Sequence, residues 1–218
     1  MGDTVSDRYE FSLPADSTAV VVVDMQNDFL APDGFFARVG VDVTPVTGIV
    51  PAIARVVASA RAADVPVIYT RMWNKADEML PALHRILPRR DRDTARTATC
   101  VEGTPGAQIV DALAPLDGDA IVDKTQYSAF FRTDMEDVLA RLGVDTVVVT
   151  GATTNVCVDS FVRDAYFRGM DVVLVEDAVA SYEQQLHDAT IRNVDLLFGA
   201  VADADYVTSL LRPAGVAA

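Results

Sequence analysis

The chain has 218 residues, half of them hydrophobic, and a formal net charge of −14; this suits one domain with a full core, and an acidic surface repels nucleic acid and anionic membranes. Its two cysteines exclude a disulfide-rich secreted scaffold and favour a cytoplasmic location. We also expect no secretory leader and no membrane span, because the sequence has neither a basic start before an apolar run nor an apolar stretch of about 20 residues.

Strand-like and helix-like segments alternate along the chain. Short runs rich in Val and Ile indicate strands, and apolar residues spaced three or four apart indicate helices. Residues 19–23 are an unbroken apolar run, which is typical of a strand buried on both faces of a parallel sheet. In chain order we predict strands at 19–23, 65–70, 119–124, 145–150, 171–175 and 200–201, and helices at 45–63, 109–114, 133–143, 155–168, 183–198 and 205–211.

This alternation predicts an α/β fold. Strands that follow one another through helices require right-handed crossovers, so we expect an open, mostly parallel six-stranded sheet sandwiched between helices. Residues 1–18 are interpreted as an N-terminal tail and 19–212 as a single domain. Residues 25–40 are expected to be irregular. Residues 71–106 are the longest stretch without a regular pattern, and we interpret them as a lid or rim of a site.

One predicted helix has recognisable ends. Thr133-Asp134-Met135-Glu136 has the residue types of a capping box, in which a Thr hydroxyl and a Glu carboxylate satisfy free backbone N–H groups. Gly143 follows as the expected C-terminal glycine.

Residues 147–158 place a cysteine just after a strand. The small residues Gly151 and Ala152 suit a sharp turn, and either Thr154 or Asn155 is suited to cap the next helix. Cys157 then lies in the first turn, where the positive end of the helix dipole favours a thiolate. The same pattern also fits an inert, packed cysteine.

Three reactive side chains are predicted at one edge of the sheet. Asp24 ends the first strand, Lys124 ends the third, and Cys157 follows the fourth. Ligands bind at the carboxyl ends of parallel strands, near the point where strand order reverses. There Asp24 can accept the thiol proton while Lys124 stabilises the thiolate. Taken singly, the Asp also fits a backbone cap and the Lys a solvated side chain, and neither His84 nor His187 lies at a predicted strand end.

Several segments carry a family resemblance. The chain resembles the isochorismatase-like cysteine hydrolases over residues 19–207. The resemblance implies that Asp24, Lys124 and Cys157 form a catalytic triad. It also implies a cis peptide between Ala152 and Thr153 and an oxyanion hole made by the backbone N–H groups of Thr153 and Cys157. The matching segments are 23–29, Lys124 and 151–158, with lesser agreement at 103–107, 127–130 and 163–165.

Within this family the sequence looks most like the ureidoacrylate and biuret amidohydrolases. This resemblance implies attack by Cys157 on an amide, ureido or carbamoyl carbonyl of a small molecule, with a thioester intermediate and Asp24 as the proton carrier. The metal-binding Asp-x-His motif of nicotinamidases is absent from residues 71–75, so no metal and no cofactor is expected. The presence of Cys157 favours acyl transfer over isochorismatase-type cleavage of a vinyl ether. That activity, or a non-catalytic small-molecule-binding relative, remains the alternative.

Five residues are candidates for substrate binding. Four aromatic residues are predicted to line the pocket, although aromatic residues after strands also serve as core. The guanidinium of Arg71 is suited to a substrate carboxylate and equally to a surface ion pair. The resemblance also implies a homo-oligomer, either a dimer or a tetramer. The predicted aromatic residues are Phe29, Trp73, Tyr127 and Phe131.

Overall fold

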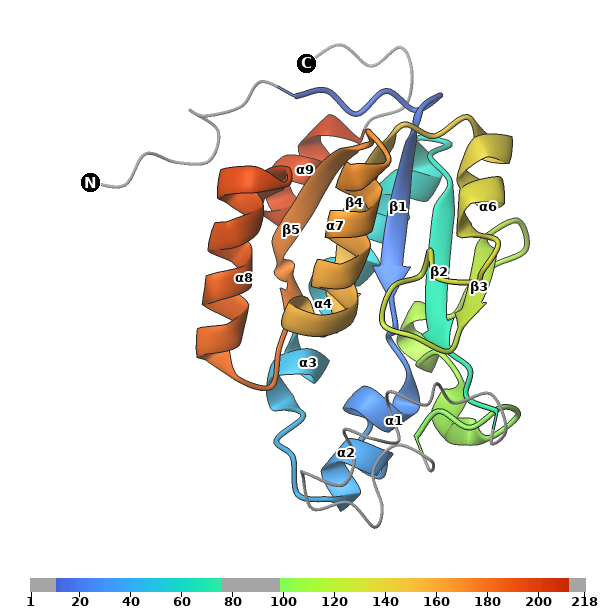
Figure 1. The fold of residues 1–218 in the computed structure, drawn as a ribbon, viewed down its shortest axis with the longest axis vertical. Coiled ribbons are helices and arrows are strands. Elements are labelled where there is room, and N and C mark those ends of the chain that lie inside the picture. Colours follow the sequence, from blue (N-terminus) through green and yellow to red (C-terminus); the bar gives the residue numbers. More distant parts are fainter. Residues whose placement is uncertain (1–10, 76–98, 212–218) are drawn as a thin grey trace.

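The computed structural model describes residues 11–75 and 99–211, and most of the predicted lid lies outside them. Six strands form one sheet in the order β3-β2-β1-β4-β5-β6, and every pair of neighbours runs parallel (Figure 1). The predicted α/β fold with a six-stranded sheet is therefore confirmed, with all rather than most strands parallel. The strands are β1 Thr18–Val23, β2 Val67–Met72, β3 Ala120–Lys124, β4 Thr146–Ala152, β5 Asp171–Ala180 and β6 Ala200–Ala202.

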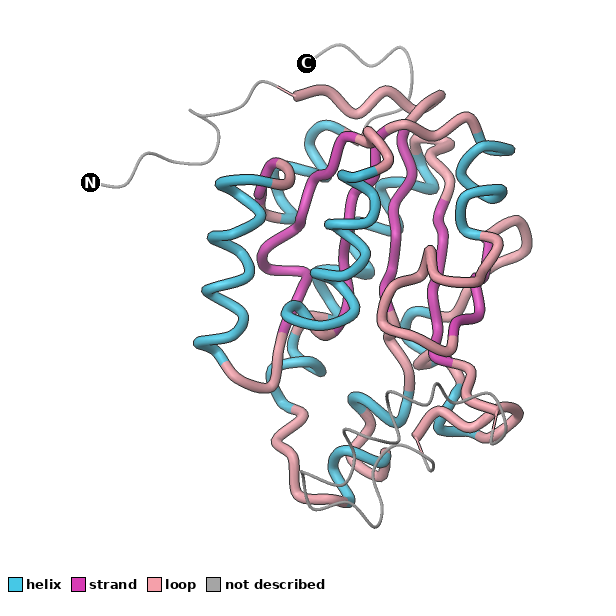
Figure 2. Tube along the Cα trace, viewed as in Figure 1, coloured by secondary structure: helices cyan, strands magenta, loops and turns pink. Residues whose placement is uncertain are grey.

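Helices cover both faces of this sheet (Figure 2). One apolar cluster joins the sheet to α3, α4 and α9, and a second joins the other face to α6, α7 and α8. The short helices α1 and α2 lie beyond the carboxyl end of β1 (Figure 1). The helical elements are α1 Asn27–Leu30, α2 Phe35–Arg38, α3 Thr44–Gly48, α4 Val50–Ala62, η3 Pro105–Ala107, η4 Asp111–Leu113, α6 Met135–Leu142, η5 Thr154–Val158, α7 Asp159–Phe167, α8 Gln184–Leu197 and α9 Ala204–Leu210.

Strand β1 shows why its sequence is apolar throughout. Val20 and Val22 belong to one cluster, whereas Val21 and Val23 belong to the other. Side chains alternate between the faces of a strand, so a strand covered on both sides needs apolar residues at every position. β1 also lies between β2 and β4, where the strand order reverses. This reversal creates the crevice in which such folds place their ligands.

Strand β4 approaches β1 closely at its end. Gly151 pairs with Val23 and has a φ of +109°. A Cβ added at Gly151 would lie 2.1 Å from the Val23 carbonyl oxygen. Any side chain at this position would therefore collide with β1, and the left-handed conformation also favours glycine. The turn that leads to Cys157 begins with this glycine.

Several predicted elements differ from those observed. The helix predicted at 109–114 is only the short 3-10 helix η4. Residues 25–40 were expected to be irregular but contain α1 and α2, which are single turns too short to show a helical period. The predicted helix at 45–63 is divided at Ile49 into α3 and α4. Strand β5 continues five residues beyond the predicted 171–175, because its distal part pairs with the end of β4 after a shift in register.

The predicted capping box is also wrong. Helix α6 begins at Met135, and Glu136 pairs with Arg168 instead of the backbone. The Thr133 hydroxyl does accept the Met135 N–H, at 3.3 Å. Gly143 closes the helix in the left-handed conformation, as predicted. The N-cap is Asp134, so Glu136 lies at the second helical position and not at the third position that a capping box requires.

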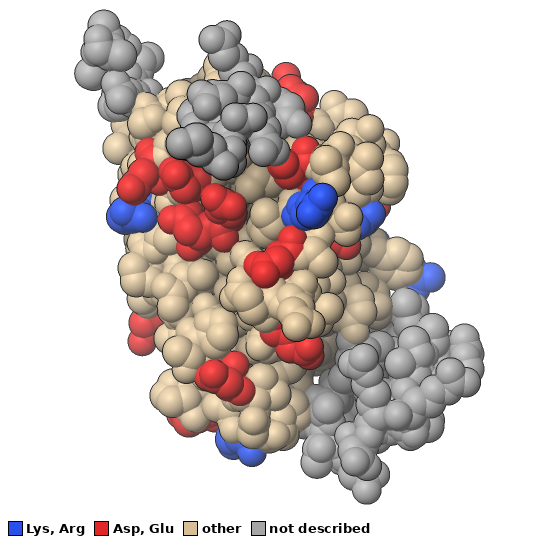
Figure 3. Space-filling view, turned by 90° about the vertical axis from the view of Figure 1, so that its left-hand side faces the viewer, with Lys and Arg blue, Asp and Glu red and all other residues tan. Residues whose placement is uncertain are grey.

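In Figure 3, Asp and Glu side chains form clusters on the face in view, and Lys and Arg side chains are sparser there. This agrees with the formal charge of −14. Over the described ranges, every helix is too short or too polar to traverse a lipid bilayer. The predicted boundaries of the tail and the domain stay predictions, as residues 1–10 and 212 lie outside those ranges.

Candidate active site

The structure brings Asp24, Lys124 and Cys157 together at the carboxyl edge of the sheet. The Lys124 Nζ lies 2.7 Å from Asp24 Oδ2 and 3.5 Å from Cys157 Sγ. The side chains of Asp24 and Lys124 are fully buried, and Cys157 is 6% exposed. A carboxylate, an ammonium and a thiol therefore share one desolvated site, as their positions at strand ends predicted.

Thr70 holds the carboxylate of Asp24. The Thr70 hydroxyl donates to Asp24 Oδ1 at 2.7 Å, and the Asp24 backbone N–H donates to the Thr70 carbonyl at 3.1 Å. Asp24 itself has a φ of +51°, which turns the chain out of β1. One oxygen of the carboxylate is thus anchored, and the other faces Lys124. The sequence analysis missed Thr70, although its position in the last buried part of β2 is a usable signal.

Lys124 is surrounded by acceptors. In addition to Asp24 and Cys157, its Nζ contacts the Gln126 carbonyl at 3.0 Å and Met72 Sδ at 3.1 Å. Burial lowers the pKa of Lys124, but attraction to Asp24 and to a charge on Cys157 outweighs burial and raises the pKa above its ordinary value. Lys124 is therefore an ammonium at neutral pH.

Cys157 is a thiol in the resting site. Burial raises its pKa to about 12, and the opposing effect of Lys124 is partly cancelled by the charge of Asp24 and by a hydrogen bond between Asp24 and the thiol. The helix start was expected to favour a thiolate, and desolvation by burial outweighs that effect in the resting site. The predicted cap is also absent, since neither Thr154 nor Asn155 makes a side-chain bond to the free N–H groups of η5.

The turn before Cys157 has an unusual backbone. The peptide between Ala152 and Thr153 is cis, at the position that the resemblance implied. The Thr153 carbonyl accepts the N–H groups of Val156 at 3.0 Å and Val158 at 3.3 Å. Among residues 11–75 and 99–211, no acceptor is recorded for the Thr153 N–H. This donor is therefore available to a ligand at the start of η5.

A known family shares this sequence and arrangement. The family described as Isochorismatase domain matches residues 18–206, which is most of the chain. The chain belongs to the isochorismatase family. It is a hydrolase of the amidohydrolase type, which acts on C–N bonds.

Relatives and solved structures agree with this family. The chain is 35% identical over 205 residues to ureidoacrylate amidohydrolase RutB of Methylobacterium radiotolerans, covering 89% of this chain and 80% of that protein. A crystal structure of a cysteine hydrolase from Pseudomonas syringae pv. phaseolicola has a TM-score of 0.80 and 31% identity, over 93% of this chain and 95% of the other. N-carbamoylsarcosine amidase from Thermoplasma acidophilum has a TM-score of 0.70 and 26% identity, over 87% and 97%.

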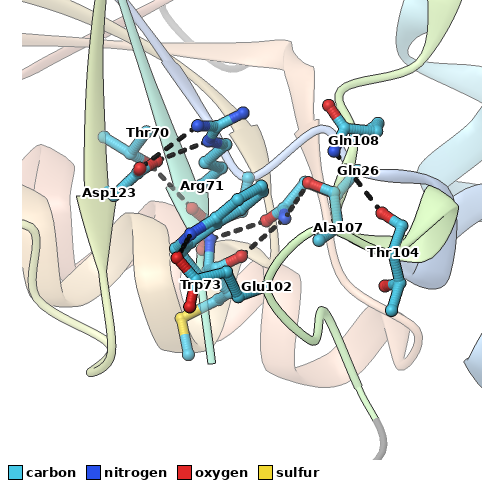
Figure 4. A network of polar contacts seen from close by, with 11 residues as sticks. Gln26, Thr70, Arg71, Trp73, Glu102, Thr104, Ala107, Gln108 and Asp123 are labelled. Carbon is cyan, nitrogen blue, oxygen red and sulfur yellow. Dashed lines mark hydrogen bonds and ion pairs between the residues drawn. The ribbon is translucent and has the colours of Figure 1, made fainter. Parts of the chain in front are cut away.

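In this isochorismatase-family chain, the residues after Asp24 hold the neighbouring loops. The buried Gln26 amide accepts the Met72 N–H at 2.7 Å and donates to the carbonyls of Met72 and Ala107, each at 2.8 Å. Figure 4 shows the Gln26 side chain between the end of β2 and the loop at Ala107. Gln26 therefore connects the end of β2 to the loop at Ala107, at the edge of the site.

Asp28 forms a second brace. Its Oδ1 accepts the Phe35 N–H at 3.0 Å, and its Oδ2 accepts the Cys100 N–H at 2.7 Å. A Cβ added at Gly106 would lie 2.3 Å from Asp28 Oδ2, so the loop approaches this carboxylate closely. Asn27 also donates to the Pro105 carbonyl at 2.9 Å. Residues 23–29, the first segment that matches the family, thus supply the carboxylate of Asp24 to the site. Three further residues of this segment hold the neighbouring loops in position.

Arg71 and Trp73 lie against each other at the exit of β2. Two N–H groups of Arg71 pair with Asp123, with Nη2 3.1 Å from Oδ2, and the guanidinium carbon lies 3.9 Å from the Trp73 ring centroid. Trp73 Nε1 donates to Glu102 at 3.0 Å (Figure 4). Arg71 therefore makes the surface pairing that was its alternative interpretation. Roles of Arg71 and Trp73 toward a substrate stay predictions.

Phe29 belongs to an aromatic cluster that includes a residue missed by the sequence analysis. The Tyr182 hydroxyl donates to the Phe29 carbonyl at 2.9 Å, and its ring stacks on Phe36 with centroids 5.0 Å apart. Burial raises the pKa of Tyr182, and negative charge at Cys100 and Cys157 raises it further. Tyr182 therefore connects the segment after β5 to the loop at Phe29. Tyr182 follows the carboxyl end of β5, and this position could have identified it as a candidate site residue from the sequence.

Tyr127 and Phe131 lie nearer the surface. They are 37% and 41% exposed, and the guanidinium of Arg132 lies over the Phe131 ring at 5.1 Å. Half-exposed aromatic rings suit the entrance of a pocket as well as a contact with solvent. Their predicted pocket role stays a prediction.

Proposed function

We propose that this isochorismatase-family hydrolase cleaves a C–N bond of a small amide, ureido or carbamoyl compound, with Cys157 as nucleophile and a thioester as intermediate. The contact of the buried Lys124 ammonium with both Asp24 and Cys157 supports this most strongly. A buried ion pair beside a thiol supplies a proton acceptor and a charge that stabilises the thiolate.

In the acylation step, Cys157 Sγ attacks the carbonyl carbon and its proton passes to Asp24. Because burial raises the pKa of Cys157, this proton moves during the attack instead of before it. The N–H groups of Thr153 and Cys157 stabilise the oxyanion. Asp24, now a carboxylic acid, protonates the departing nitrogen, the C–N bond breaks and the thioester forms.

In the deacylation step, a water molecule attacks the thioester carbonyl and gives a proton to Asp24. The same oxyanion donors serve this second tetrahedral intermediate. The C–S bond breaks, the acid product leaves and Asp24 returns its proton to the Cys157 sulfur. Lys124 keeps its proton throughout, and its role is to stabilise the charge that moves between the carboxylate and the sulfur.

Ureido and N-carbamoyl acids are the proposed substrate class. The names of two relatives, ureidoacrylate amidohydrolase and N-carbamoylsarcosine amidase, both describe a carbamoyl group on the nitrogen of a carboxylic acid. Cleavage of such a compound breaks the bond between the carbamoyl carbon and a nitrogen, which is the reaction that the proposed thioester chemistry performs.

We expect Cys157→Ala to lower turnover of a cleaved ureido acid by at least roughly 10³-fold, because the nucleophile is lost. The measurement is release of ammonia and of the acid product from ureido acids, biuret and simple amides. Cys100→Ala, a change at the other buried thiol, is the matched control and should keep turnover. Mass spectrometry of the wild type with a slow substrate should reveal an adduct on Cys157.

The alternatives give different results in the same assay. Full turnover by Cys157→Ala would contradict the thioester mechanism. Cleavage of a vinyl ether but of no C–N compound would favour the isochorismatase-type reaction. A wild-type protein that binds ureido acids without cleaving them, and in which an alkylating reagent labels Cys157 no faster than Cys100, would be a non-catalytic binder.

A further inference from the structure

His187 reaches the turn that carries Cys157. Its Nδ1 lies 3.0 Å from the Thr154 hydroxyl oxygen. Thr154 is fully buried, whereas His187 is only partly buried in the first turn of α8. Within the described part of the chain, no other partner of the Thr154 hydroxyl is recorded. This imidazole is therefore the contact that satisfies a buried hydroxyl next to the active site.

Thr154 occupies a sensitive place in the turn. It follows Thr153, whose N–H is free among the described residues, and it begins η5, which contains Cys157. The Thr153 carbonyl is already held by two N–H groups of η5. The side chain of Thr154 ties the same turn outward to α8. A shift of Thr154 would therefore rotate the Thr153 N–H and displace the start of η5.

We propose that His187 is a positioning residue for the oxyanion hole, acting through its hydrogen bond to Thr154. This inference rests on the proposed function, because it assigns the Thr153 N–H to a developing oxyanion. His187 would not touch the substrate. It would hold the donors in the geometry that the transition state requires, and a displacement of a catalytic group by about 1 Å can lower a rate by roughly 100-fold.

The charge state of His187 suits this role. Burial lowers its pKa, and Asp188 opposes that effect only in part. A neutral imidazole at neutral pH can donate or accept at Nδ1, so it can match whichever role the Thr154 hydroxyl takes. The element that carries His187 also packs directly on the element that carries Thr154, because α8 contacts η5 as well as β5.

Four single variants and one double variant test the contact. His187→Leu keeps bulk without a hydrogen bond, and Thr154→Val replaces the hydroxyl by a methyl group. Each should lower kcat for a cleaved ureido acid roughly 10- to 100-fold and change KM less than about twofold. His187→Asn, whose amide lies near the position of Nδ1, and Thr154→Ser should each keep kcat within about threefold. The double variant His187→Leu with Thr154→Val should be no slower than the worse single variant.

A second measurement does not depend on turnover. The chain has two histidines, so their imidazole protons are readily separated by NMR, and His84 serves as the internal reference. Thr154→Val should move the titration of His187 and leave that of His84 unchanged. Wild-type kcat in His187→Leu, or additive effects in the double variant, would overturn the inference alone. A wild-type protein without Cys157-dependent turnover would overturn the proposed function and this inference together.

Discussion

The proton of Cys157 and the carboxylate of Asp24 are linked by one ammonium. Lys124 lies 2.7 Å from the Asp24 oxygen and 3.5 Å from the sulfur, so it attracts negative charge on either group. Before the proton moves from sulfur to carboxylate, the ammonium pairs with the Asp24 carboxylate. After the transfer, it pairs with the Cys157 thiolate. This property of a single residue explains how a thiol with a pKa raised to about 12 could still serve as a nucleophile.

Removal of the Asp24 charge should affect rate and stability together. In Asp24→Asn the proton acceptor is lost and Lys124 becomes a buried charge without its ionic partner. We expect kcat to fall at least roughly 10³-fold and the free energy of unfolding to fall by about 3–5 kcal/mol. Steady-state kinetics and urea denaturation measure the two effects.

Thr70→Val is the matched control for this change. It removes the hydrogen bond to Asp24 Oδ1 and leaves the carboxylate in place, so the expected loss of stability is about 1–3 kcal/mol and the loss of rate is smaller. An Asp24→Asn enzyme with near wild-type kcat would show that another group carries the proton.

The raised pKa of Cys157 predicts a pH-dependent stability. The folded protein keeps the thiol proton up to about pH 12, whereas the unfolded chain releases it above its ordinary pKa of 9.0. Its contribution is therefore complete below pH 9 and is lost as the pH rises toward 12. Compared with Cys157→Ser, the wild type should lose about 1 kcal/mol of unfolding free energy between pH 9 and 10.

Urea denaturation of both proteins at pH 7, 9 and 10 tests this difference. Cys100 and the tyrosines are present in both proteins, so their titration cancels in the comparison. A difference that stays constant from pH 7 to 10 would contradict a protonated, desolvated Cys157.

At the scale of elements, the loop that follows β1 and the loop that follows β2 are joined by buried side chains. The Gln26 side chain accepts the Met72 N–H and donates to the Met72 carbonyl, and it also donates to the Ala107 carbonyl. These bonds cross 46 and 81 residues of sequence. The edge of the site is therefore held by side-chain to backbone bonds instead of by sheet pairing.

Gln26→Leu should be strongly destabilising. It leaves the partly buried N–H and carbonyl of Met72 and the buried carbonyl of Ala107 without their partner, at roughly 1–3 kcal/mol for each unsatisfied group. Gln108→Leu is the control, because the Gln108 amide is exposed and makes one long bond of 3.4 Å to Thr104. Thermal or urea unfolding should show a loss of about 3 kcal/mol or more for Gln26→Leu. Equal losses for the two variants would contradict the bracing role.

At the scale of the whole molecule, negative charge opposes compaction. The formal charge is −14, and clusters of acidic side chains lie on the face seen in Figure 3. Burial raises the pKa of Glu176, and the nearby carboxylates of Asp177, Asp203 and Asp195 raise it further. A pKa raised by folding means that ionised Glu176 weakens the fold above its folded pKa.

Glu176→Gln should therefore stabilise the protein at pH 7. Glu176 is partly exposed, so solvent screening limits the gain to less than about 1 kcal/mol. The gain should shrink as salt rises from 10 mM to 500 mM or so, because the repulsion is screened. Glu183→Gln removes one charge at the start of α8, where the helix dipole favours an acid, and should give no gain. A stabilisation independent of salt would point to packing instead of charge.

The pattern of apolar residues along the chain was enough to predict the α/β fold of this protein. Apolar runs located all six strands, and their alternation with helices required a parallel sheet, because only crossover connections join such strands. Asp24, Lys124 and Cys157 could then be placed at one edge, since parallel strands end on the same side of a sheet. The family resemblance added the cis peptide at Ala152–Thr153, which spacing does not encode.

Only the tertiary structure decided which partners these groups have. Thr70 lies 46 positions from Asp24 and His187 lies 33 from Thr154, and no local period relates them. Glu136, predicted to cap its own helix, pairs with Arg168 at a separation of 32 residues. The protonated state of Cys157 likewise depends on its burial and on the charges of Lys124 and Asp24, which other strands bring to it. Periodicity reports which face of an element is buried, whereas contacts and pKa values depend on what other elements bring to that face.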